Sequence, residues 1–238
     1  MFCSSFFMPH ACLLGDIIYN SRMKKYIKTY DNVLPDMLCK TLIEKFEINK
    51  DQHIKTDLKD HRHFTEINLN EHQDWDMMVK ALYNGLKPYI AKYKEDCNIQ
   101  PKQWPDNYGF EQIRMKRYLP NDKDEFKNHV DVGDHASARR FLVFFLYLND
   151  NFGGQTSFKE YDTIVQPQTG KLLMFPPTWT YLHAGHKPIK TPKYIIVTTI
   201  RFGAWCQLTC FQGTHRSFLT HMPGHRLLTC VLTCVGIA

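Results

Sequence analysis

The sequence lacks several features that would place it in a broad class at once. No apolar run reaches the ~20 residues that a transmembrane helix needs, and the apolar stretch at residues 227–238 is shorter. The first ten residues contain no lysine or arginine, unlike the start of a secretory signal. No internal repeat or low-complexity tract is present. We therefore expect no membrane association and a cytoplasmic protein.

Dense clusters of basic residues are also missing. The net charge of +6 and pI near 8.8 are mildly basic, but lysine and arginine are spread along the chain. A dedicated nucleic-acid surface concentrates these residues on one patch. We therefore expect an ordinary solvated surface and do not expect a nucleic-acid partner.

The eight cysteines lack the spacing of common zinc sites. Four of them lie in the segment 203–238, in two pairs separated by three residues, with three histidines between the pairs. Structural zinc sites commonly use a two-residue spacer. A chain of 238 residues that is 43% hydrophobic also needs no disulfide framework. We expect free thiols, and an irregular C-terminal tail of unknown role rather than a zinc module.

The sequence does contain enough apolar residues for one domain with extensions. Residues 1–22 show no period and are expected to be an irregular extension. Residues 23–110 are expected to be a helical support region, with Asp36 capping one helix and a longer apolar stripe over residues 75–93, where Pro88 can introduce a kink. The polar stretch 51–70 between these helices, including His61-Arg-His63, is interpreted as a surface loop.

After residue 110 the pattern changes to short strands. Phe141-Leu-Val-Phe-Phe-Leu-Tyr-Leu148 is a continuous apolar run, as expected for a strand buried on both faces. Further strands are expected at 110–118, 163–167, 171–175 and 194–200, separated by glycine- and proline-containing turns. Many short strands at such intervals favour a sandwich or barrel of the jelly-roll kind.

The most informative short motif is His129-Val-Asp131. Residues two apart on a strand point to the same face, so an imidazole and a carboxylate project side by side. A second imidazole from a distant strand, such as His183, would complete the two-histidine, one-carboxylate set of non-haem Fe(II) oxygenases. Lys193 leads into a β-branched strand, where a buried ammonium needs an anionic partner.

Several motifs in order strengthen this interpretation. They are His129-x-Asp131, Gly153-Gly154-x-Thr156-x-Phe158, Gly170-Lys-Leu-Leu-Met-Phe-Pro176, His183-Ala-Gly-x-x-Pro188 and Lys193-Tyr194. This order resembles the prolyl 4-hydroxylase family of 2-oxoglutarate- and Fe(II)-dependent dioxygenases over residues 111–202. The resemblance implies an α+β fold with a double-stranded β-helix (jelly-roll) core over 111–202 and supporting N-terminal helices.

The resemblance also implies roles for individual residues. His129, Asp131 and His183 match the Fe(II) ligands, and Lys193 matches the partner of the distal carboxylate of 2-oxoglutarate. Tyr118 resembles the tyrosine that hydrogen-bonds the same carboxylate. Thr156 and Thr198 are candidates to line the pocket, with buried sheet threonines as an equal alternative. Gly153 and Gly154 are expected to shape a turn.

The family resemblance implies Fe(II), 2-oxoglutarate and O2 as reaction components, with ascorbate to restore over-oxidised iron. It favours hydroxylation of a prolyl residue in a peptide or protein, with release of succinate and CO2. Two alternatives stay open: the same cofactors acting on a nucleic-acid base or a small molecule, and a non-catalytic metal-binding jelly-roll module. The segment Asn121-Asp-Lys-Asp-Glu125 replaces the Gly-Gln pair of many relatives, so the substrate contacts beside it are not predicted. The sequence does not indicate the oligomeric state.

Overall fold

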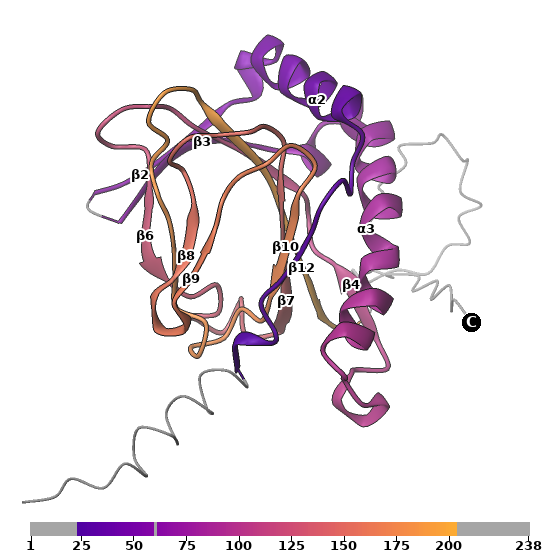
Figure 1. Ribbon diagram of the computed structural model, residues 1–238. Coiled ribbons are helices and arrows are strands. Elements are labelled where there is room, and N and C mark those ends of the chain that lie inside the picture. The colour runs from indigo at the N-terminus through magenta and orange to yellow at the C-terminus, as the bar shows by residue number, and fades with distance from the viewer. Residues whose placement is uncertain (1–22, 60, 204–238) are drawn as a thin grey trace, which may run out of the picture.

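A computed structural model describes residues 23–59 and 61–203. Over these residues, twelve strands form one curled, antiparallel sheet with two long helices packed outside it (Figure 1). The order along the sheet is β1-β10-β7-β12-β5-β3-β6-β11-β8-β9, with β2 paired to β3 and β4 to β12. The strands are β1 (Lys28–Tyr30), β2 (Ile54–Leu58), β3 (Arg62–Asn68), β4 (Tyr108–Phe110), β5 (Arg114–Tyr118), β6 (Phe126–His129), β7 (Arg140–Tyr147), β8 (Thr156–Phe158), β9 (Thr163–Val165), β10 (Leu172–Phe175), β11 (His183–Gly185) and β12 (Lys193–Phe202). The α+β jelly-roll architecture is as the sequence predicts.

The two long helices are α2 (Asp36–Ile48) and α3 (Asp76–Asp96), and Figure 1 shows both on the same side of the barrel. Pro35 occupies the N-cap position of α2 with an extended backbone, so Asp36 is the first helical residue and not the predicted cap. α3 runs as one helix through Pro88. Short 3₁₀ turns are η1 (Lys50–Gln52), η2 (Leu69–Glu71), η3 (Gln73–Trp75), η4 (Pro101–Gln103) and η5 (Lys159–Tyr161).

The helices cover the outer face of the sheet through an apolar stripe. Val79, Leu82, Leu86, Ile90 and Tyr93 recur on one face of α3 and are buried. They pack in one core cluster with the outward-facing residues of β7, β10 and β12. Burial of such side chains is the main force that holds a helix on a sheet.

The strand β7 is buried on both faces, as its continuous apolar run predicts. Leu142, Phe144 and Leu146 belong to the cluster under the helices. Val143 and Phe145 alternate with them and belong to a second cluster inside the barrel. The functional side chains described below pack against this second cluster.

The prediction of a surface loop over residues 51–70 is wrong. This segment forms the β2–β3 hairpin, and β3 pairs with β5, with Glu66 opposite Lys116. The support region at 23–110 therefore contributes strands β1 to β4 to the sheet as well as both helices. The strand pattern was hidden because the side chains of Arg62 and Glu66 face a polar cleft instead of an apolar core.

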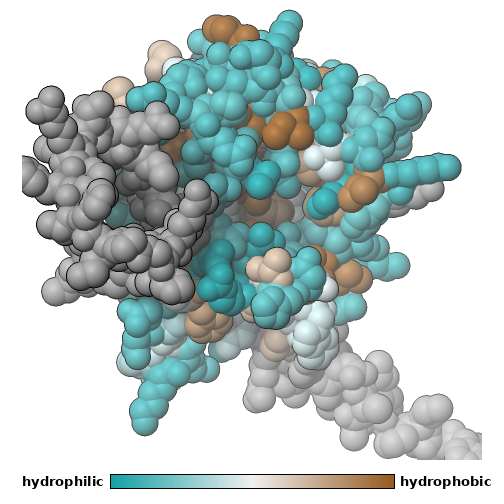
Figure 2. All heavy atoms as spheres, turned by 180° about the vertical axis from the view of Figure 1, so that it is seen from behind, coloured by the Kyte–Doolittle hydropathy of each residue, from teal (hydrophilic) through white to brown (hydrophobic). Residues whose placement is uncertain are grey.

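In the described part of the chain, no helix is long and apolar enough to span a bilayer. Figure 2 shows one face of the molecule as mainly hydrophilic, with small separate apolar spots. Cys39 and Cys97 are buried free thiols, in line with the expectation. The other six cysteines, the N-terminal extension and the tail from residue 204 onward lie outside the described residues.

Candidate active site

The structure brings the three predicted metal ligands together. β6 and β11 are antiparallel neighbours, and His129 lies directly opposite His183 in their register. Asp131 follows the end of β6, where its backbone N–H donates to the carbonyl of Pro177 at 3.2 Å. One ligand atom from each of the three side chains lies within 4.8 Å of the others. Strand pairing thus unites side chains that are more than fifty residues apart.

The polar atoms of this triad fit a divalent metal. Nδ1 of His129 lies 2.7 Å from the carbonyl of Lys127, and Nδ1 of His183 lies 3.0 Å from that of Tyr181. A carbonyl only accepts, so each Nδ1 carries the proton and each Nε2 presents a lone pair. Both Nε2 atoms and one carboxylate oxygen of Asp131 are buried and lack hydrogen-bond partners among the described residues. These are the donor atoms that a non-haem Fe(II) site uses.

Burial keeps the ring of His129 neutral. Desolvation, helped by the neighbouring His183, lowers the pKa of His129 to about 2. The ring is therefore unprotonated at neutral pH, as a metal ligand must be. Phe145, Phe158 and Phe175 surround His183, with ring centroids 4.7 to 5.9 Å from its own. This aromatic wall limits the access of water to the second ligand.

Lys193 lies deeper in the barrel, opposite Tyr118 in the β5–β12 register. Its ammonium is 4.3 Å from the centroid of the Tyr118 ring. It donates to the carbonyls of Gly154 at 2.9 Å and His186 at 3.3 Å. The side chain is 1% exposed, and this burial lowers the pKa of Lys193 to about 7. An anion bound here would restore the charged form.

Gly154 has a packing role beyond the predicted turn. Its φ is +60°, and a Cβ at this position would lie 3.0 Å from Cδ of Lys193 and 2.9 Å from Oδ1 of Asn151. A side chain would therefore collide with the lysine stem as well as strain the backbone. The Gly-Gly motif both turns the chain and leaves room for Lys193.

Tyr147 is a buried polar residue of the barrel interior that no sequence motif indicates as functional. Its hydroxyl lies 2.6 Å from that of Thr156, and both side chains are buried. Tyr147 is opposite Ile195 and belongs to the same interior cluster as Tyr118. The one sequence feature that could have indicated this role is a tyrosine hydroxyl at the end of an otherwise apolar strand. Such a hydroxyl requires a polar partner inside a core.

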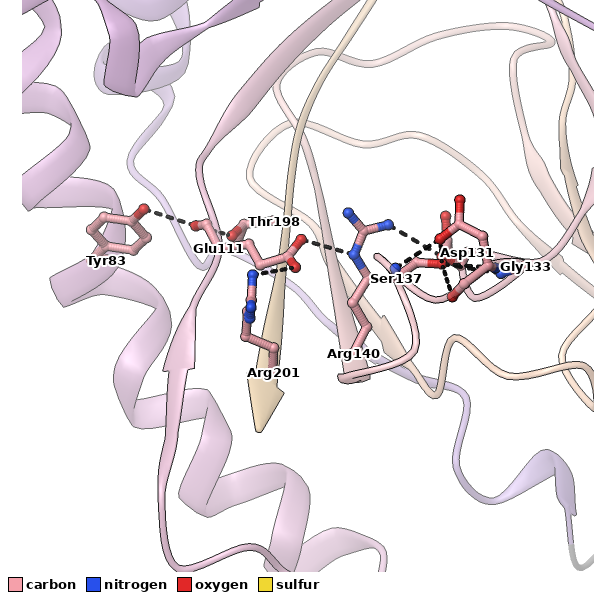
Figure 3. Close-up of polar contacts among 9 residues, drawn as sticks. Tyr83, Glu111, Asp131, Gly133, Ser137, Arg140, Thr198 and Arg201 are labelled. Atoms are coloured by element: carbon pink, nitrogen blue, oxygen red, sulfur yellow. Dashed lines mark hydrogen bonds and ion pairs between the residues drawn. The ribbon is translucent and has the colours of Figure 1, made fainter. Parts of the chain in front are cut away.

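Thr198 lies five residues after Lys193 on β12, so the two side chains face opposite sides of the strand. Its hydroxyl donates to the backbone carbonyl of Glu111 at 2.9 Å (Figure 3). The structure therefore places Thr198 in a hydrogen bond to the chain before β5 and does not bring it beside Lys193. A contact between Thr198 and 2-oxoglutarate stays a prediction.

A charged network that the sequence analysis missed supports Asp131. Nε of Arg140 donates to Glu111 at 2.8 Å, and its Nη1 donates to the carbonyl of Asp131 at 3.2 Å (Figure 3). Glu111 also lies 3.6 Å from Arg201. The network ties the segment that carries the carboxylate ligand to β12. The residues of this network belong to separate strands and connections, so no local sequence motif could predict the network.

The segment 121–125, which departs from the family pattern, is held by a buried carboxylate. Asp124 accepts hydrogen bonds from the backbone of Leu119 at 2.7 Å and from Asn121 at 3.0 Å. Nδ1 of His63 lies 2.5 Å from the same carboxylate, whose side chain is 3% exposed. Asp124 thus joins the loop before β6 to the β2–β3 hairpin.

We expect Asp124→Asn to destabilise the protein by about 1–3 kcal/mol, because an amide nitrogen would replace an acceptor among buried donors. The free energy of unfolding from urea titration measures this effect. Asp122→Asn is the matched control, since Asp122 is exposed in the same loop. Equal stabilities of the two variants would contradict the anchoring role of Asp124.

A cleft of about 470 Å³ opens beside the triad. His129 and Asp131 lie in its wall, together with Arg62 and Glu66 of β3 and Lys116 of β5. Lys193 and His183 do not line this cleft. The structure therefore combines an open cleft at two of the metal ligands with a buried ammonium at Lys193, to which an anion could bind.

The comparisons with known proteins match this geometry. The family model of the 2OG-Fe(II) oxygenase superfamily matches residues 113–201, which contain the triad and Lys193. These residues form a 2OG-Fe(II) oxygenase domain. The chain is accordingly a 2-oxoglutarate-dependent dioxygenase, whose family uses Fe(II) and 2-oxoglutarate. No curated protein sequence matches the chain significantly.

Solved structures similar to the oxygenase include several prolyl hydroxylases. A viral collagen prolyl hydroxylase from Paramecium bursaria Chlorella virus-1, in complex with 2-oxoglutarate, has 20% identity and a TM-score of 0.54, covering 74% of this chain and 96% of that chain. A Trichoplax adhaerens prolyl hydroxylase bound to a hypoxia inducible factor peptide fragment has 14% identity and a TM-score of 0.59, covering 82% and 94%. A Pseudomonas putida prolyl-4-hydroxylase has 15% identity and a TM-score of 0.54, covering 79% and 98%. The fold is therefore prolyl 4-hydroxylase-like.

Proposed function

We propose that the oxygenase hydroxylates a prolyl residue of a peptide or protein. In the overall reaction, the substrate C–H, 2-oxoglutarate and O2 give C–OH, succinate and CO2, with one oxygen atom of O2 in each of the alcohol and succinate. The observation that carries the proposal is that His129 and Asp131, which hold unpartnered triad atoms, line the open cleft. An open cleft admits a polymer segment, and the Trichoplax enzyme of similar fold is bound to a peptide.

Each chemical task of the reaction has a residue in this proposal. His129, Asp131 and His183 would hold Fe(II), which with 2-oxoglutarate supplies the oxidising chemistry when both are bound. The ammonium of Lys193 would pair with the distal carboxylate of 2-oxoglutarate in a low-dielectric pocket, where charge pairing is strong. Tyr118 would support that ammonium through its ring, 4.3 Å away. The backbone carbonyls of Lys127 and Tyr181 keep both imidazoles oriented for metal binding.

The test offers proline-rich peptides and alkylated oligonucleotides to the enzyme with Fe(II) and 2-oxoglutarate. We expect succinate formation to rise with peptide, and mass spectrometry to find a gain of one oxygen atom on proline. The His183→Ala variant serves as the inactive control. Oxidation of a nucleic-acid base or of another amino acid, with proline unchanged, would contradict the prolyl assignment while keeping the enzyme class.

Three further expectations stay predictions. Ascorbate dependence follows from the family resemblance alone, and comparing turnovers per enzyme with and without ascorbate tests it. The cytoplasmic localisation is inferred from sequence features only. The division into an extension, a support region, a jelly-roll core and a Cys/His tail is tested by whether residues 23–203 fold and turn over 2-oxoglutarate without the flanking segments.

A further inference from the structure

One wall of the cleft beside the metal ligands is cationic. Arg62 lies on β3, and Arg114 and Lys116 lie on β5, its antiparallel neighbour. Residues 62, 64 and 66 alternate onto one face of β3, and residues 114, 116 and 118 onto the same face of β5. All three basic side chains line the cleft, and we call them the cationic wall.

Glu66 is the carboxylate that forms ion pairs with the cationic wall, and the charge of Asp131 also acts on Lys116. Glu66 accepts from Nη1 of Arg114 at 3.1 Å, and its second oxygen lies 3.9 Å from Nζ of Lys116. Arg62 has no ion-pair partner in the part of the chain that the structure describes, and its Nε is buried without a hydrogen-bond partner there. A buried, unpaired guanidinium N–H is costly, so this group is suited to an incoming acceptor.

The remaining acidic groups of the cleft already have other partners. Glu111 pairs with Arg140, and the carboxylate of Asp134 accepts from the backbone and hydroxyl of Ser137. Asp131 belongs to the metal site. The cleft lining holds four basic and four acidic side chains, so its formal charges balance, and Arg62 is the basic group that has no ion-pair partner among the described residues.

Aromatic rings place the cationic wall next to the reaction centre. The guanidinium of Arg62 lies 5.6 Å from the centroid of Phe126, and Nζ of Lys116 lies 5.9 Å from it. The same Phe126 ring stacks on the metal ligand His129 at 3.3 Å. The Phe126 ring therefore lies between the cationic wall and the metal ligand His129, so a group bound at the wall is close to the metal ligands.

Lys193 differs from the cationic wall in its burial and in its hydrogen-bond partners. Lys193 is 1% exposed, donates to carbonyls inside the barrel and does not line the cleft. Lys116 lines the cleft, with a side chain that is 13% exposed. The two ammonium groups are nevertheless near each other, because Lys116 contributes to the lowered pKa of Lys193.

We infer that the cationic wall binds an acidic side chain of the substrate, so that the enzyme selects peptides with aspartate or glutamate close to the hydroxylated residue. This inference rests on the proposed peptide substrate and adds its charge preference. Arg62 supplies the fork of N–H donors that a carboxylate accepts, and Lys116 adds a second charge. Both are specificity-determining residues.

The test measures binding without turnover. The full chain is loaded with Fe(II) and 2-oxoglutarate without oxygen, and two labelled peptides are titrated that differ only in aspartate or asparagine on both sides of a central proline. We expect the aspartate peptide to bind about tenfold more tightly at low salt, and this preference to shrink as salt rises. In Arg62→Gln and Lys116→Gln the preference should fall to about twofold or less, because the charge partner is gone.

Two further variants sharpen the result. Glu66→Gln removes the competing carboxylate and should strengthen binding of the aspartate peptide. Lys40→Gln removes an exposed charge on α2 and should change neither affinity. The affinity for 2-oxoglutarate should be the same in Lys116→Gln and the unmodified enzyme.

Several results would overturn the inference: equal affinities for the two peptides, no binding of either, a loss of 2-oxoglutarate affinity in Lys116→Gln, or tighter competition by a single-stranded oligonucleotide. Admitting oxygen then tests the reaction separately. Preferred binding of the aspartate peptide without proline oxidation would refute prolyl hydroxylation and support the cationic wall. Proline oxidation without a preference for the aspartate peptide would support prolyl hydroxylation and refute the role of the cationic wall.

Discussion

Replacing His183 with alanine will abolish stoichiometric Fe(II) binding and reduce 2-oxoglutarate turnover by more than about 100-fold. The Nε2 atom of His183 is buried, lacks a partner among the described residues and lies 3.6 Å from the carboxylate of Asp131. Its removal leaves one imidazole and one carboxylate, which cannot form the three-ligand face. His129→Ala should have the same effect.

Iron content per chain and succinate formation measure this loss. His72→Ala, which replaces a histidine preceding α3, is the control and should keep both. Circular dichroism shows whether each variant keeps its fold. A folded His183→Ala or His129→Ala protein with full iron content and turnover would show that the metal lies elsewhere.

Lys193→Ala will raise the KM for 2-oxoglutarate by about 100-fold or more, because a buried carboxylate would lose its cation. The free lysine has its pKa lowered to about 7, first by burial and second by Lys116. The ammonium form binds the dianion, so affinity for 2-oxoglutarate should be full below pH 7. Above that value it should fall by about tenfold per pH unit, as the fraction of charged lysine falls.

Isothermal titration of 2-oxoglutarate between pH 6 and pH 9 measures this dependence (about one pH unit on either side of the pKa and beyond). Lys193→Arg keeps its charge over the range and should lose the pH dependence. Lys190→Ala removes an exposed lysine nearby in sequence and should bind as the unmodified chain does. An unchanged KM in Lys193→Ala would assign the carboxylate to another basic residue such as Arg201, although Arg201 already lies 3.6 Å from Glu111.

The two predictions differ in how far sequence alone could support them. The two-residue spacing of His129 and Asp131 puts both side chains on one face of a strand, a local geometric rule. The ten-residue step from His183 to Lys193 was informative only through the family resemblance. The structure adds a physical reason, since β11 and the start of β12 bring both residues into one barrel interior.

The β2–β3 hairpin shows where local patterns failed. Its strand β3 carries Arg62 and Glu66 toward the cleft, so the usual alternation of apolar and polar residues is weakened. A polar-lined cleft makes a strand look like a loop, because the hydrophobic pattern reports burial in an apolar core. Arg62, which we propose to govern substrate choice, therefore lies in a segment that the sequence predicted to be a surface loop.

Local periodicity was enough to predict the apolar stripe of α3, the doubly buried strand β7 and the paired ligands His129 and Asp131. Contacts between distant groups became known only from the folded chain. His183 lies opposite His129, Arg140 donates to the carbonyl of Asp131, and the cationic wall lines the cleft. The reason is that strand pairing and charge pairing act between residues far apart in the chain, and one sequence carries no direct record of such contacts.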